Sequence, residues 1–136
     1  MQNKTLKKIV VLIIFIFIVN TLAMKFHWYY TFWWFDLVMH FLGGFWVGLS
    51  ALWLIFLRFK VINSLFLERL LPIFIVSFLS VLLVGILWEF FEISIDTLIT
   101  FNPQDLTDTL SDLVMDLIGS FVASMYFIFK INNNKV

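Results

Sequence analysis

The chain has 136 residues, of which 62% are hydrophobic and 13% are charged, whereas soluble domains average about 45–50% and about 25%. This composition excludes a soluble globule. The apolar excess throughout the chain, together with the even balance of nine basic and nine acidic residues, also excludes a nucleic-acid binder and a disordered tail. No cysteine is present, so disulfides, a thiolate nucleophile and Cys-ligated zinc are excluded as well. The sequence therefore predicts an all-α, polytopic integral membrane protein.

A helix needs about 20 apolar residues to cross about 30 Å of hydrocarbon, and four charge-poor stretches meet this requirement. The predicted spans are residues 8–25, 36–58, 70–93 and 110–130, a four-transmembrane-helix bundle within a single transmembrane domain, residues 1–136. We interpret the first stretch as a span and not as a signal peptide, because its C-terminal flank is aromatic and basic. The loop before the fourth span contains Asn102-Pro103, which predicts an N-cap with Pro at the first helical position. The fourth helix is therefore expected to begin near Pro103, with Asp105 in its first turn.

The fourth span is short of apolar residues. Only thirteen residues (117–129) separate Asp116 from Lys130, which is about 20 Å of helix. To cross the bilayer, the helix must extend back through Asp116 and towards Asp112. The length of the span therefore predicts carboxylates inside the membrane.

The basic residues predict the orientation of the chain. Eight of the nine flank the spans on one side, which the positive-inside rule makes cytoplasmic, so both termini are expected in the cytoplasm. These eight are Lys4, Lys7, Lys8, Arg58, Lys60, Arg69, Lys130 and Lys135. On the outer side, residues 27–35 hold five of the nine Trp and Tyr residues, which favours an interfacial aromatic belt over a substrate-stacking lip.

Eight of the nine acidic residues lie towards the outer side. Residues three or four apart share a helix face, and the acidic positions of three helices share their faces with Gly or Ala, which mark helix contacts in membranes. The acids are therefore expected to point into the bundle. The helix of the second span carries Asp36, His40, Gly44 and Gly48. The helix of the third, continued beyond the span, carries Gly85, Glu89, Glu92 and Asp96. The helix of the fourth, which begins before the span, carries Asp105, Asp108, Asp112, Asp116, Gly119 and Ala123.

Such an acidic cluster requires either protonated carboxyls or a bound cation, because charged side chains in a bilayer are costly. Carboxylates with one imidazole and no sulfur suit Mg²⁺, Mn²⁺, iron or Zn²⁺. The predicted metal ligands are Asp36, His40, Glu89 and Asp112, with Glu92 or Asp116 as general base. Simpler interpretations remain open: His40 as a buried hydrogen-bonding residue, Glu89 and Glu92 as hydrated interfacial residues, and Asp105 and Asp108 as solvent-facing residues at the helix start.

Three segments carry a family resemblance: Phe35-Asp36-Leu37-Val38-Met39-His40-Phe41, Leu87-Trp88-Glu89-Phe90-Phe91-Glu92, and residues 108–119. Over residues 36 to 120 the chain resembles the YjdF-like small bacterial inner-membrane proteins and, more remotely, the VanZ-like proteins linked to glycopeptide-antibiotic resistance. The resemblance implies a multi-pass protein of the cytoplasmic (inner) membrane with a shared polar site, but it names no reaction. The matched residues are Asp36, His40, Glu89, Glu92, Asp108, Asp112 and Gly119. Asp116 departs from the YjdF-like pattern and resembles a polar position of VanZ-like chains.

The sequence is compatible with three functions. The first is a membrane enzyme whose divalent ion acts on a lipid-linked or envelope substrate; the second is an accessory or scaffold protein; the third is proton or cation transport. No nucleophile, arginine cluster or Gly-rich phosphate loop accompanies the acids, so whether the chain is an enzyme stays open. The expected partners are the lipid bilayer and no nucleic acid, and a homo-oligomer is compatible with the sequence.

Overall fold

The computed structural model describes residues 2–59, 70–95, 97–98 and 105–133, and these residues contain no strand. The elements are α1 (Gln2–Lys25), a short α2 (Trp28–Thr31), α3 (Phe35–Leu52) continued by one π-helical segment η1 (Trp53–Arg58), α5 (Leu70–Ile95) and α6 (Leu106–Asn132). Four helical segments within the described residues are long and apolar enough to cross a membrane. The prediction of an all-α, four-helix membrane protein is confirmed, and each predicted span lies within one of these segments.

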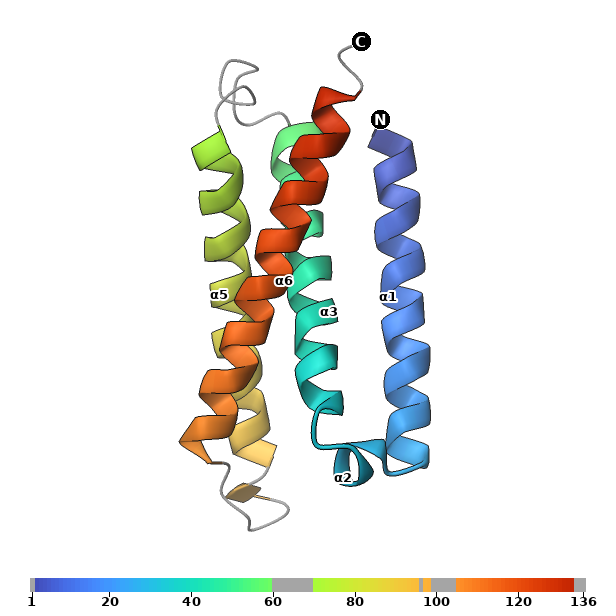
Figure 1. The fold of residues 1–136 in the computed structure, drawn as a ribbon, viewed down its shortest axis with the longest axis vertical. Coiled ribbons are helices and arrows are strands. Elements are labelled where there is room, and N and C mark those ends of the chain that lie inside the picture. The colour runs from blue at the N-terminus through green and yellow to red at the C-terminus, as the bar shows by residue number, and fades with distance from the viewer. Residues whose placement is uncertain (1, 60–69, 96, 99–104, 134–136) are drawn as a thin grey trace.

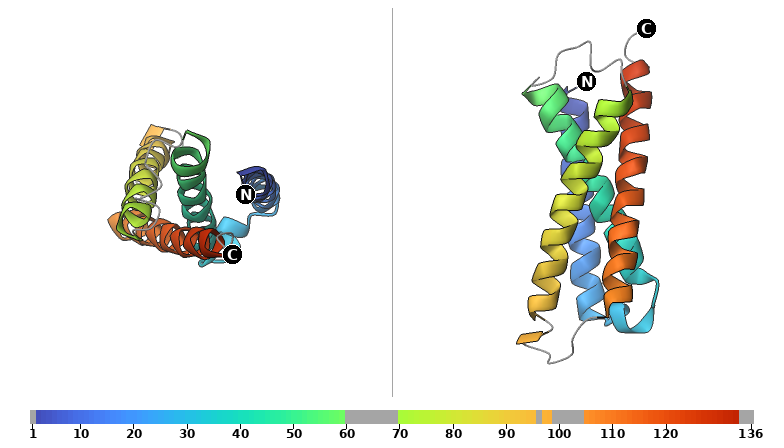
Figure 2. Two further views of the ribbon diagram at one scale, coloured as in Figure 1. Left: turned by 90° about the horizontal axis from the view of Figure 1, so that it is seen from above. Right: turned by 90° about the vertical axis from the view of Figure 1, so that its left-hand side faces the viewer.

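The four long helices run roughly side by side (Figure 1). Seen along the bundle, α3, α5 and α6 pack around one another, whereas α1 lies on the far side of α3 from α5 (Figure 2). The start of α1 and the end of α6 lie at one end of the bundle, which we call the terminal end; the opposite end, beside α2, is the α2 end. Acidic residues at the start of α3, the end of α5 and the start of α6 therefore come to the same α2 end.

Glycines allow the backbones of α3 and α6 to touch. A Cβ atom added at Gly44 would collide with the carbonyl oxygen of Asp116, and one added at Gly119 would collide with the carbonyl oxygen of Phe41. Close approach through small residues is how membrane helices gain packing energy, because lipid offers no hydrophobic driving force between them. The predicted glycine faces are thus the faces along which α3 and α6 pack.

Serines fill the core towards the terminal end. The hydroxyl oxygens of Ser77 on α5 and Ser120 on α6 lie 2.8 Å apart, and the Ser124 hydroxyl donates to the Ser120 carbonyl oxygen at 3.0 Å. All three side chains are fully buried. Around and below them the helices pack apolar residues such as Leu49 and Phe127. The hydroxyls of these three serines are therefore hydrogen-bonded to each other or to backbone.

Polar contacts attach α1 to the rest of the bundle. The indole N–H of Trp46 donates to the Ile9 carbonyl oxygen at 3.1 Å, and the Lys130 ammonium group donates to the Thr5 hydroxyl oxygen at 2.7 Å. The second contact joins the start of α1 to the last turn of α6. The lysines of both segments are predicted from the sequence to lie on the cytoplasmic side.

The start of α6 differs from the prediction. The helix begins at Leu106, and Asp105 is its N-cap in extended conformation, with its carboxylate accepting from the Thr107 N–H at 3.3 Å. Asp105 therefore precedes the first turn and does not belong to it, because its side chain satisfies an otherwise unpaired helix N–H. Asn102 and Pro103, the predicted start, lie outside the described residues.

Candidate functional site

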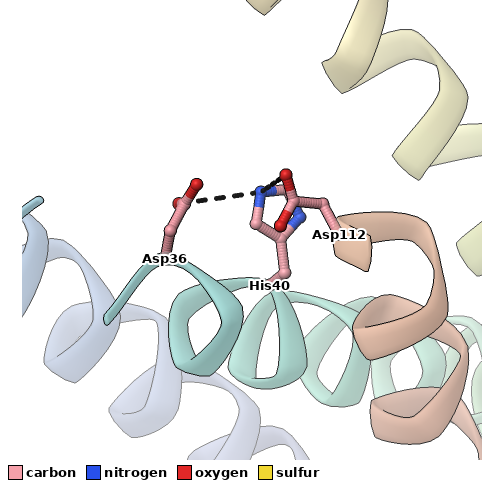
Figure 3. Close-up of side chains that lie close together, drawn as sticks. All are labelled: Asp36, His40 and Asp112. Atoms are coloured by element: carbon pink, nitrogen blue, oxygen red, sulfur yellow. Dashed lines mark ion pairs between the residues drawn. The ribbon is translucent and has the colours of Figure 1, made fainter. Parts of the chain in front are cut away.

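Three predicted ligands meet at the α2 end of the bundle. Asp36 and His40 stand one turn apart on α3, and Asp112 faces them from α6 (Figure 3). The His40 Nε2 atom lies 3.8 Å from Asp36 Oδ1 and 3.8 Å from Asp112 Oδ2. One atom from each of the three residues lies within 4.8 Å of the others. Residues 72 or more positions apart in sequence are thus brought to one point, as the shared helix faces predicted.

Asp116 lies on the opposite side of the same imidazole ring. Its Oδ2 atom is 3.5 Å from the other ring nitrogen of His40, Nδ1. Asp116 is one helical turn deeper in the bundle than Asp112, and its side chain is 10% exposed. The two aspartates of α6 therefore approach His40 from different sides.

Glu89 and Glu92 bring α5 to the same histidine. With His40 they form a second group in which one ligand atom of each residue lies within 4.8 Å of the others. Glu89 is buried and Glu92 is half-buried. His40 belongs to both groups, so α3, α5 and α6 all contribute to one cluster, which we call the His40 cluster: Asp36, His40, Glu89, Glu92, Asp112 and Asp116.

Asp112 stands out in this cluster because its carboxylate makes no hydrogen bond to the described protein atoms. Its side chain is fully buried, and neither carboxylate oxygen has a hydrogen-bond partner in the part of the chain that the structure describes. A buried carboxylate without hydrogen bonds is destabilising by about 1–3 kcal/mol, and by more when it is ionised. Such a group requires a proton, an ordered water molecule or a cation.

The geometry is compatible with a single divalent ion. Bonds of about 2.0–2.2 Å place two ligand atoms of one ion at most about 4.4 Å apart, and the ligand atoms of Asp36, His40 and Asp112 already lie within 4.8 Å of one another. Small side-chain rotations would bring them into range. Carboxylate oxygens together with one imidazole nitrogen fit Mg²⁺, Mn²⁺, iron and Zn²⁺.

Other polar residues near the α2 end do not join the cluster. Asp105 and Asp108 are solvent-exposed, which agrees with the simpler interpretation of both residues. Asn20 on α1 accepts a 2.6 Å hydrogen bond from the Tyr29 hydroxyl, so it joins α1 to α2. Asp96, which the sequence placed on the acidic face of the third span, lies outside the described residues.

Tyr29 is a residue that the sequence interpretation missed. The run of aromatic residues assigned it to an interfacial belt, yet it is half-buried next to the cluster. Burial, followed by the negative charges of Asp36 and Glu92, raises the pKa of Tyr29 to about 12. Its phenol therefore stays protonated and donates to Asn20. No periodic pattern marks this position, because α2 is a single turn within an aromatic-rich loop.

A family model described as a predicted membrane protein (DUF2238) matches residues 2–133. The chain belongs to this family. It is the YjdF-like family to which the three sequence segments point. Comparisons with curated proteins and with solved structures give no match.

Family membership covers all four long helices, so the whole bundle, and not the cluster alone, is what the family has in common with this chain. The family is described by its membrane location and not by a reaction. Any chemistry must therefore be argued from the His40 cluster itself.

Proposed function

We propose that this protein binds a divalent metal ion in the His40 cluster, near the outer face of the bacterial cytoplasmic membrane. The ligands would be Asp36, His40, Glu89 and Asp112. The observation that carries the proposal is Asp112, a fully buried carboxylate with no hydrogen-bond partner in the described residues, which faces a histidine and a second aspartate.

The chemistry that such an ion supplies when bound is Lewis-acid polarisation of a phosphate, or activation of water near neutral pH. Within the protein, Glu92 is half-buried beside the ligand group and has the carboxylate needed to accept a proton from a reacting group. A substrate held at the membrane surface, such as a lipid-linked or envelope precursor, would reach a cluster at this depth. The polar residue Asp116 also supports a VanZ-like relation as part of this proposal.

Orientation is part of the same proposal. Lys4 and Lys8 at the start of α1 and Lys130 at the end of α6 share the terminal end of the bundle, which the positive-inside rule assigns to the cytoplasm. Single cysteines replacing Lys4, Thr31 and Asn133, all exposed, test it with an impermeant thiol reagent on intact cells. Only the cysteine at position 31 should be labelled. Labelling at position 4 or 133 would show that the proposed orientation is wrong.

Metal binding is tested by stability in mild detergent. A metal that binds only the folded protein stabilises it by about 2.7 kcal/mol at a hundredfold excess over Kd, so Mn²⁺, Zn²⁺ or Mg²⁺ should raise the melting temperature above that in chelator. His40→Ala and Asp112→Asn should remove this difference. If no divalent ion shifts the melting of the wild type while lower pH stabilises it, protonated carboxyls explain the cluster and the metal proposal is wrong.

A transport role is the weaker alternative. Within the described residues no carboxylate lies deeper than Asp116, and the core beyond it consists of serines, small residues and apolar side chains. Among the described residues, a proton or cation entering at the α2 end would therefore find no further carboxylate or imidazole on its way to the lysines of the terminal end. An accessory or scaffold role, with a purely structural metal, is compatible with the same site. Only a measurement of catalytic turnover distinguishes this role from that of an enzyme.

A further inference from the structure

Asp116 occupies a space that glycines leave open on two neighbouring helices. A Cβ atom at Gly85 on α5 would lie 2.8 Å from Asp116 Oδ2, and one at Gly44 on α3 would collide with the Asp116 backbone. At Gly43 the corresponding distance to Asp116 Oδ1 is 4.0 Å, which is ordinary contact. The carboxylate is thus fixed between α3 and α5 by the shape of the helix crossing.

This fixed carboxylate lies 3.5 Å from Nδ1 of His40, whereas Nε2 lies 3.8 Å from both Asp36 and Asp112. A neutral imidazole has one N–H donor and one nitrogen with a free lone pair. A histidine that binds a metal through one nitrogen usually donates its other N–H to a carboxylate or carbonyl, which sets the tautomer and the ring orientation.

We infer that Asp116 is the positioning residue of the His40 cluster: it accepts the Nδ1–H of His40 and thereby directs the Nε2 lone pair towards Asp36 and Asp112. This role rests on the proposed metal site. It differs from the general-base role that the sequence suggested for Asp116, because Asp116 contacts Nδ1, whereas Asp36 and Asp112 lie near Nε2, the other ring nitrogen. The 3.5 Å contact needs to shorten by about 0.5 Å to become a standard hydrogen bond.

Burial makes such a positioning group necessary. His40 is 6% exposed and Asp116 is nearly as buried, so bulk water is not at hand to accept the ring N–H. If the ring were protonated on Nε2 instead, its lone pair would face the Asp116 carboxylate and its N–H would point at the metal position. That arrangement would oppose metal binding on both sides of the ring.

The tautomer is directly measurable, because the chain contains only two histidines. We expect ¹⁵N-histidine spectra of the metal-free protein in detergent, recorded at a pH high enough for the imidazole to be neutral, to show Nδ1–H for His40, with His27→Gln identifying the second set of signals. Asp116→Asn, whose amide oxygen still accepts Nδ1–H, should keep this tautomer, and Asp116→Ala should lose it. Zinc affinity, measured by calorimetry, should fall about 10–100-fold in Asp116→Ala and less in Asp116→Asn.

A matched pair of glycine variants moves the carboxylate without removing it. Gly85→Ala places a methyl group 2.8 Å from Asp116 Oδ2 and should weaken zinc binding and shift the His40 signals in the same direction as Asp116→Ala. Gly43→Ala adds the same methyl group at an ordinary distance and should leave both readouts as in the wild type. This pair keeps the inference testable if Asp116→Ala does not fold.

The outcomes separate this inference from the metal proposal. An Nε2–H tautomer in the wild type overturns the positioning role whether or not zinc binds, and an Nδ1–H tautomer that depends on Asp116 supports it. If zinc binds the wild type and Gly85→Ala with equal affinity and unchanged His40 signals, the positioning role is wrong while the metal site stands. If zinc does not bind the wild type, the metal proposal fails, and the tautomer of His40 alone shows whether Asp116 accepts its Nδ1–H.

Discussion

The terminal half and the α2 half of the α3–α5–α6 core both bury polar side chains, but of different kinds. In the terminal half, Ser77, Ser120 and Ser124 are neutral and hydrogen-bonded to each other or to backbone. In the α2 half, Asp112 is fully buried and its carboxylate has no hydrogen-bond partner among the described residues. Paired hydroxyls stabilise helix contacts in a membrane, whereas an unsatisfied carboxylate lowers stability. This difference is what we expect if the terminal half holds the fold and the α2 half binds the proposed metal ion.

The glycine contacts between the two halves support both of them. Gly44→Ala and Gly119→Ala would each drive a methyl group into the backbone of the facing helix. Overpacking against side chains costs about 1–3 kcal/mol, and a backbone partner cannot rotate away, so we expect a loss above about 3 kcal/mol together with loss of metal binding. Titration with SDS, followed by circular dichroism in mild detergent, measures the loss. Gly43→Ala is the control, and wild-type stability in Gly44→Ala would contradict the close approach of α3 and α6.

The next effect has opposite signs with and without metal. Asp112→Asn removes the unsatisfied buried charge, so in chelator at pH 8 the variant should be more stable than the wild type by about 1–3 kcal/mol. With excess Mn²⁺ or Zn²⁺ the order should reverse, because only the wild type gains from the ligand. Melting curves in the two conditions give both values. A variant less stable than the wild type in chelator would mean that the Asp112 carboxylate already has a stabilising partner without metal.

Much of this arrangement could be predicted from the sequence, because the length, hydropathy and helical period of membrane helices are tightly constrained. Hydropathy and length gave the four spans, and the period of the helix placed Asp36 and His40 on the face of Gly44, where the structure has them. The shortage of apolar residues in the last span predicted that its helix continues back through Asp116 and Asp112, and α6 does include both residues. These features depend only on local spacing and on the thickness of a bilayer.

Features that depend on tertiary geometry could not be predicted in this way. Spacing places Asp112 and Asp116 on one face of α6, yet it does not show that they approach opposite nitrogens of His40. Tyr29 was assigned to the aromatic belt because its neighbours in sequence are aromatic, although its position against Asp36 and Glu92 depends on how α2 folds back. The N-cap was placed at Asn102, because Asn-Pro is a strong local signal, whereas the Asp105 side chain caps the helix.

In the terminal half we expect a modest and metal-independent effect. Ser120→Ala removes the hydroxyl that lies 2.8 Å from that of Ser77. Hydrogen bonds between membrane helices contribute about 0.6 kcal/mol on average and about 1.7 at most, so the loss of stability should fall in this range. The stabilisation by Mn²⁺ or Zn²⁺ should equal that of the wild type. A reduced metal response in Ser120→Ala would show that the two halves of the core are energetically coupled and would contradict their separate roles.

The smallest effect is expected at Asp105, which belongs to the acidic face of the same helix but lies outside the cluster. Asp105→Asn keeps the N-cap, because Asn accepts from the Thr107 N–H as well as Asp does, and N-cap preferences of the two residues are nearly equal. Stability in chelator should therefore change by less than about 0.5 kcal/mol, and the rise in melting temperature with Mn²⁺ or Zn²⁺ should be retained. Asp112→Asn, the same chemical change two helical turns further along α6, should abolish that rise. If Asp105→Asn also abolished it, the metal would respond to the negative charge of the whole acidic face and not to the ligands around His40, and the distinction between exposed and buried carboxylates would fail.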